Sequence, residues 1–173
     1  MSDKSVSEAT PVLFGQKLAS SQTFAALFRE GMGLVEETAA YLDGPGRQQS
    51  KKLERAAALV YATESMRLTT RLMQLASWLL LHRAVNEGEM SLAQANKEKN
   101  KVKLSNGDPI DEDAAKLLPE RLNELIEQSK VLLAKVKRLD ATIHAPVPDL
   151  PSNGHPLNQQ IGLLKAAFER DGD

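Results

Sequence analysis

The sequence has 173 residues, enough for one domain with a substantial core, and it is 42% hydrophobic but only 4% aromatic. That balance is typical of helices rich in leucine and alanine rather than of aromatic-rich sheets. The lack of cysteine excludes disulfides, thiol catalysis and cysteine-based zinc sites, and a formal net charge of −1 gives no general attraction to nucleic acid or anionic membranes. The most apolar run, 75–81, is far short of the roughly 20 residues of a membrane span, and the N-terminus lacks an apolar signal core. We therefore expect a cytoplasmic protein.

A mostly polar segment, residues 1–19, predicts a flexible N-terminal arm, and a first helix follows near 21–42. The apolar residues that predict this helix recur largely at three- and four-residue steps: Phe24, Leu27, Phe28, Val35, Ala39 and Leu42. Gly31 and Gly33 lie within it and suggest points where another helix approaches closely. The sequence Asp43-Gly44-Pro45-Gly46 predicts a helix end and a short connection, so the next helix should be an antiparallel neighbour.

That next helix is predicted to be long, from about 48 to 86. Its seam alternates steps of three and four residues, as in a helical bundle: Leu53, Ala57, Val60, Glu64, Leu68, Arg71 or Leu72, Leu75, Leu79 and His82. Residues 72–81 are apolar on almost every side, and a helix that is apolar all round is buried all round. A third helix, a second subunit or both must then cover this part. We predict a homodimer with Leu75, Trp78 and Leu79 at its interface.

The last long helix is predicted near 118–143, with Pro119 in its first turn. Before it, Ser91-Leu92-Ala93-Gln94 has the pattern of a capping box that opens a short helix. Residues 20–143 should thus form the helical body.

The C-terminal segment, residues 144–173, combines a proline-rich linker with a short amphipathic stretch. Its apolar residues repeat at helical spacing and are Leu157, Ile161, Leu164 and Phe168. So short a helix needs a partner surface. Two interpretations remain equally open, since the stretch suits binding in a groove of a protein partner and would also suit folding back on the body.

Three charged residues of the long helix, Glu64, Arg67 and Arg71, lie at spacings that place them on one face. They are candidates for a partner-binding site. The alternative is an ion-pair network inside the bundle that sets helix register, which the seam position of Glu64 favours.

Catalytic and metal chemistry have little support. His82, His144 and His155 share no ligand spacing, and no phosphate loop, Gly-x-Ser-x-Gly or His-Glu-x-x-His sequence is present. We therefore predict no enzyme activity, no metal site and no cofactor. The basic residues of the long helix suggest a second hypothesis, a nucleic-acid-associated regulator: Arg47, Lys51, Lys52, Arg55, Arg67, Arg71 and Arg83. The near-zero net charge and the acidic residues of the first helix (Glu30, Glu36 and Glu37) argue against it.

Two strings, FREGMGLVEETAAYLDGPGR from Phe28 and YATESMRLTTRLMQLASWLL from Tyr61, resemble the alphaproteobacterial RcdA family, the regulators of CtrA degradation. The resemblance runs from about Val12 to Leu104. It implies a dimeric three-helix bundle with a disordered C-terminal tail and no catalytic residues. It also implies an adaptor that helps the ClpXP protease to receive cell-cycle substrates such as CtrA, with CpdR-like and PopA-like partners, often at a cell pole.

The fold predicted from residues and resemblance together is all-α: a three-helix bundle with a long central helix, a disordered N-terminal arm and a C-terminal tail. The predicted function is a non-enzymatic adaptor in regulated proteolysis, and the alternative is the nucleic-acid-associated regulator.

Overall fold

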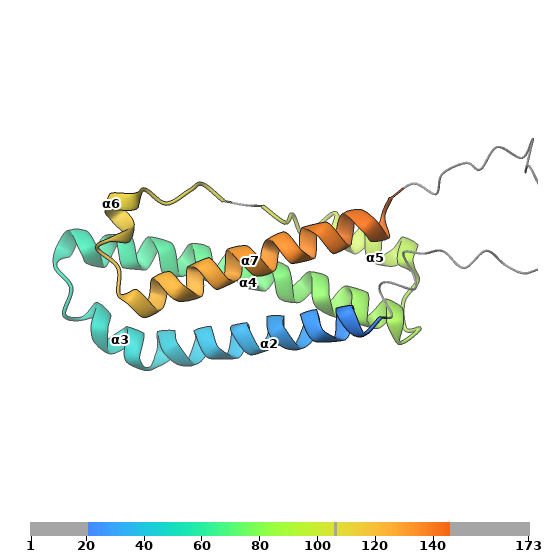
Figure 1. The fold of residues 1–173 in the computed structure, drawn as a ribbon, viewed down its shortest axis with the longest axis horizontal. Coiled ribbons are helices and arrows are strands. Elements are labelled where there is room, and N and C mark those ends of the chain that lie inside the picture. The colour runs from blue at the N-terminus through green and yellow to red at the C-terminus, as the bar shows by residue number, and fades with distance from the viewer. Residues whose placement is uncertain (1–20, 106, 146–173) are drawn as a thin grey trace, which may run out of the picture.

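The computed structural model describes residues 21–105 and 107–145, and this part of the chain is helical with no β-strand. Its three long helices are α2 (Gln22–Asp43), α4 (Arg55–Asn86) and α7 (Glu120–Ile143). Each of them packs against the other two along the long axis of the molecule (Figure 1). The predicted all-α bundle with one especially long helix is therefore confirmed. The predicted arm, residues 1–19, and nearly all of the predicted tail lie outside the described residues.

The direction of the helices has a consequence for the site. Helix α2 runs opposite to α4, whereas α7 runs in the same direction as α4 (Figure 1). The connection between α4 and α7 therefore returns along the whole bundle. It contains two short helices, α5 (Leu92–Lys99) and α6 (Glu112–Ala115). As a result the end of α7 lies beside the end of α4 and the start of α2.

The predicted single helix over 48–86 is wrong at its start. A short helix, α3 (Pro45–Ser50), follows α2 after Gly44 alone, and residues 51–54 separate it from α4. The Tyr41 hydroxyl donates a hydrogen bond of 2.7 Å to Gln49 Oε1, which ties α3 to the end of α2. The chain thus reverses at 51–54 rather than at the predicted stop, where proline occupies the first turn of α3.

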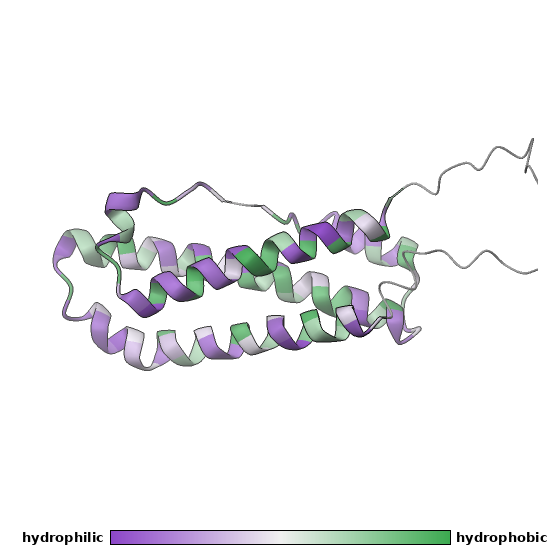
Figure 2. Ribbon diagram, viewed as in Figure 1, coloured by the Kyte–Doolittle hydropathy of each residue, from purple (hydrophilic) through white to green (hydrophobic). Residues whose placement is uncertain are grey.

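The core is built from one face of each long helix, so hydrophobic and hydrophilic residues alternate along all three (Figure 2). On α2 the buried residues are Phe24, Leu27, Gly31, Leu34, Thr38 and Tyr41. The predicted stripe was right at Phe24 and Leu27. Further on it followed Val35 and Leu42, which are only partly buried against the core, and Ala39, which is exposed. The buried face of α2 includes Gly31 and Thr38, and a pattern of apolar residues in the sequence does not detect either of them.

Gly31 is a point of close helix approach, as predicted. A Cβ atom at Gly31 would lie 2.4 Å from Leu79 Cδ1 of α4, so only glycine fits without displacing that side chain. A Cβ at Gly33 would meet nothing within 4 Å, so the same prediction is wrong there. The two glycines thus have opposite roles in packing.

The capping box predicted before α5 is confirmed, whereas Pro119 is the N-cap of α7 and does not lie in its first turn as predicted. Ser91 Oγ accepts a hydrogen bond from Gln94 N at 3.1 Å, and Ser91 N donates one to Gln94 Oε1 at 3.0 Å, which completes the capping box. Helix α7 begins directly after Pro119, two residues later than predicted, and ends at Ile143 as predicted.

Candidate functional site

The charged residues predicted on the long helix lie on the side of α4 that faces α7. Arg67 Nη1 donates to Glu64 Oε1 at 2.9 Å, and Arg71 Nη1 donates to Ser129 Oγ of α7 at 2.8 Å. Glu64 and Arg71 are only 6% and 7% exposed. Burial lowers the pKa of Arg71, and the nearby Glu64 carboxylate opposes that shift.

This geometry answers the question that the sequence left open. Glu64 and Arg71 are buried between helices, so they form a structural network. The burial of Glu64 argues against its prediction as a partner-binding residue, whereas the same prediction for Arg71, which lines a cleft, stays a prediction. The side chain of Arg67 is 41% exposed, and it lines a cleft together with Arg71 of α4 and with Ser105 and Asp108 of the α5–α6 connection.

The residues predicted at a dimer interface are also buried within the single chain. Leu75, Trp78 and Leu79 are 1%, 1% and 0% exposed, because α2 and α7 cover them. They leave no surface for a second copy, so that prediction is wrong for all three. The expectation that another helix covers this part of α4 is confirmed, since α2 and α7 pack on it.

An exposed apolar stripe lies instead on the opposite side of α4. Its large side chains recur every seven residues, at Leu59, Met66, Met73 and Leu80, and they are 70%, 72%, 65% and 53% exposed. We call these four residues the α4 stripe. A seven-residue repeat of large apolar residues is the pattern of a helix that packs against another helix. The signal was present in the sequence, but the apolar character of 72–81 was attributed to the core.

Small and uncharged residues fill the spaces of the α4 stripe. The residues four positions after its members are Thr63, Thr70, Ser77 and Ala84. Thr63 Oγ1 and Ser77 Oγ donate to carbonyl oxygens of their own helix, Leu59 O at 3.0 Å and Met73 O at 2.8 Å. These hydroxyl groups are therefore satisfied within α4. The result is a row of apolar and hydroxyl side chains about 38 Å long from Leu59 to Ala84, bordered by charged residues that include Asp108, Glu98 and Lys101.

The basic residues that suggested nucleic-acid binding do not form one continuous face. They are divided between α3, residues 51–54 and α4, and Arg71 is buried. Arg83 pairs with Glu87 at 2.8 Å, and its guanidinium carbon lies 5.0 Å from the centre of the Phe28 ring. This arrangement does not favour the nucleic-acid hypothesis. Two of the acidic residues of α2 that were expected to balance these basic residues pair instead with α7: Glu30 with Lys135 at 2.8 Å, and Glu37 with Arg121.

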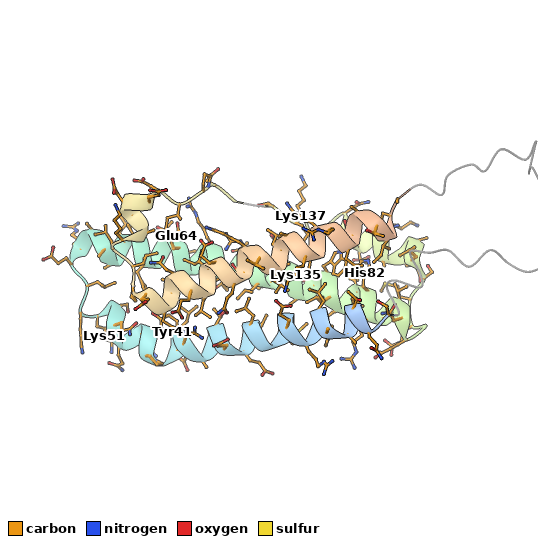
Figure 3. The ribbon with its side chains drawn as sticks, viewed as in Figure 1. Tyr41, Lys51, Glu64, His82, Lys135 and Lys137 are labelled. Atoms are coloured by element: carbon orange, nitrogen blue, oxygen red, sulfur yellow. The ribbon has the colours of Figure 1, made fainter. Side chains whose placement is uncertain are left out.

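Two of the three histidines come together at the end of the bundle where α4, α5 and α7 meet. His82 is buried on α4, at the opposite end of the bundle from Glu64 (Figure 3). Its ring centre lies 5.9 Å from that of His144, the residue that ends α7. Asp140 lies between these histidines and Lys99 of α5, and its Oδ2 accepts a hydrogen bond of 2.6 Å from Lys99 Nζ. His82 and His144 thus lie close together although they share no ligand spacing in the sequence, and His155 lies outside the described residues.

The fold and its surfaces define a helical bundle with a charged interior network and one long outer row of apolar and hydroxyl side chains. Among the described residues, no helix combines the length and the apolar character needed to cross a membrane. A family model described as "Protein of unknown function (DUF1465)" matches residues 15–168, and the chain belongs to this family, which is the RcdA family. The expected resemblance is thereby confirmed.

A solved structure is also similar, the crystal structure of RcdA from Caulobacter crescentus CB15. It shares 49% sequence identity with this chain, with a TM-score of 0.63, over 76% of this chain and 99% of the other. No protein of curated function matches the sequence.

Proposed function

We propose that the protein is a non-enzymatic adaptor in regulated proteolysis, which helps to deliver cell-cycle regulators to the ClpXP protease. The observation that carries the proposal is the α4 stripe, an exposed apolar row on a rigid helix. Large exposed apolar patches on folded proteins mark sites of protein association. Membership of the RcdA family supports the proteolytic setting, with CpdR-like and PopA-like partners, CtrA-like substrates and a position in the cytoplasm at a cell pole.

We assign the α4 stripe to a second copy of this chain. Its seven-residue repeat suits packing against an identical helix, since small residues alternate with large ones along the seam. Full burial of one such side chain contributes about 1.5–3 kcal/mol to the free energy of association. The eight half-exposed side chains of two copies can therefore contribute on the order of 10 kcal/mol to dimer formation. Association costs about 4–15 kcal/mol, so the dimer depends on every member of the stripe.

The C-terminal stretch Leu157, Ile161, Leu164 and Phe168 is proposed as the element that binds protein partners. These residues lie outside the described part of the chain. Their support is the amphipathic spacing and the proline-rich linker before them. A dimer carries two such elements, and tethering raises their local concentration, commonly into the millimolar range.

The dimer is tested with Met73→Glu and a matched control, Val131→Glu. Both residues are exposed and apolar, at 65% and 55%, but Val131 is on α7 and away from the stripe. We expect the unmutated chain and Val131→Glu to sediment as dimers at tens of micromolar, and Met73→Glu as a monomer with unchanged helicity. A monomeric unmutated chain would refute the assignment.

The adaptor function is tested by reconstitution. Purified ClpXP, a CtrA-like substrate and the CpdR-like and PopA-like proteins are combined with and without this protein. We expect the rate of substrate loss to rise with the full chain and to stay at its basal value with Met73→Glu. An unchanged rate with the full chain and all partners present would contradict the proposal.

A further inference from the structure

The cluster of His82, Asp140 and His144 has the composition of a metal site. One possible ligand atom from each residue lies within 4.8 Å of the others. Two imidazoles and one carboxylate form a donor set that borderline metal ions such as Zn²⁺ bind. The three residues come from α4 and the end of α7, so an ion here would join two long helices.

The hydrogen bonds around His82 leave one nitrogen free for a ligand. His82 Nδ1 lies 3.0 Å from the carbonyl oxygen of Trp78, and since a carbonyl only accepts, the proton of the neutral ring is on Nδ1. The lone pair is then on Nε2, which is buried and has no hydrogen-bond partner. His82 is 1% exposed, so bulk water does not satisfy this atom. A backbone carbonyl behind a ligating histidine is a common arrangement in metal sites.

The other two residues are also held toward the same point. His144 Nε2 is buried without a hydrogen-bond partner and lies 3.4 Å from Asp140 Oδ1. Two tetrahedral zinc ligands are about 3.3 Å apart, so this pair already has a suitable separation. Asp140 Oδ1 accepts from Trp78 Nε1 at 2.8 Å, and Oδ2 accepts from Lys99 Nζ at 2.6 Å. These two bonds fix the orientation of the carboxylate.

We propose that His82, Asp140 and His144 bind one divalent transition-metal ion, with Zn²⁺ as the best fit, and that the ion clamps the end of α7 to α4. Water completes the four-coordinate shell. Burial lowers the pKa of both histidines, which keeps the rings neutral and able to ligate at neutral pH. The ion is structural, because it ties down the point from which residues 146–173 continue.

The positive charge of Lys99 opposes binding of a metal cation to the cluster. Its ammonium group already neutralises Asp140 and would lie close to the ion. Replacement by methionine keeps most of the side-chain volume and removes the positive charge. Lys99→Met should therefore bind the ion more tightly than the unmutated chain, whereas loss of either histidine should weaken binding.

The experiment is a zinc titration of the full chain, purified without a histidine tag and stripped with a chelator. Calorimetry should give one Zn²⁺ per chain, and Co²⁺ should give the visible absorption of a four-coordinate site. We expect His82→Gln and His144→Gln each to weaken binding at least tenfold, Lys99→Met to strengthen it, and His155→Gln, a control histidine that is not one of the three proposed ligands, to change nothing.

A second readout guards against loss of fold in the His82 variant. Zn²⁺ should raise the melting temperature of the unmutated chain and of His155→Gln but not that of His144→Gln, since His144 is the C-cap just after α7 and its replacement spares the core. No zinc uptake by the stripped unmutated chain, or equal uptake by both cluster variants, would overturn the proposal. Loss of uptake in His155→Gln would assign the ion to another site and would also overturn it.

Discussion

The buried network between α4 and α7 makes a sharp prediction for stability. Glu64→Gln removes a negative charge while leaving the shape of the side chain almost unchanged. Arg71, which is 7% exposed, then keeps a hydrogen bond to Ser129 and the weaker influence of Glu127, but it loses the larger of the two opposing charges that act on it. A buried cation that loses most of its opposing charge is destabilising, because the guanidinium group has left water with little compensation.

The magnitude follows from the burial of each partner. Removal of one member of a directly paired buried ion pair costs about 3–5 kcal/mol, and we expect about the lower end here because Ser129 and the charge of Glu127 stay in place. Arg71→Met should cost less than about 1 kcal/mol. Its apolar replacement fills the site, Glu64 keeps its 2.9 Å bond to the half-exposed Arg67, and Ser129 Oγ still donates to Ile126 O at 2.6 Å. The two variants should therefore differ by about 2 kcal/mol or more.

Urea unfolding followed by circular dichroism measures this difference, with all variants at one protein concentration so that dimerisation contributes equally. About 3 kcal/mol corresponds to a fall in melting temperature of roughly 6–12 °C for a chain of this size. In the double variant the cost should be smaller than the sum of the two single costs, since no buried cation remains. The reasoning is refuted if Glu64→Gln is as stable as the unmutated chain, or if Arg71→Met is the less stable of the two.

Three further predictions follow from the structure. Gly31→Ala should lower the free energy of unfolding by about 1–3 kcal/mol because its Cβ meets Leu79 in the core, whereas Gly33→Ala should raise it by up to about 1 kcal/mol. A Gly31→Ala variant as stable as the unmutated chain would contradict this packing. In the metal-free chain the pKa values of His82 and His144 are lowered from 6.5, so the unfolded state binds more protons, and unfolding free energy should fall as pH falls below about 6.5. A flat pH profile would show that these rings are not buried as described. Truncation after His144 should leave melting and dimerisation nearly unchanged while reducing substrate delivery, and precipitation of the truncated chain would show that the tail belongs to the core.

Much of the fold was predictable because its signals are local. The capping box at Ser91, the end of α7 and the helical state of the three long segments depend on contacts within about four residues. The seam position of Glu64 also correctly indicated a buried carboxylate with a basic partner, Arg67. By contrast, the reversal at 51–54 has no glycine or proline to mark it, and it arises because α3 packs on the end of α2.

The sequence alone determined helix content, the main caps and which helix would be longest, since periodicity and capping express interactions between near neighbours. The tertiary structure decided which face of each helix is buried. Trp78 and Leu80 are both large and apolar, and only the positions of α2 and α7 place one in the core and the other on the surface. The same holds for His82 and His144, which lie far apart along the chain. They meet because the long return connection sets α7 parallel to α4, a long-range arrangement that no local pattern encodes.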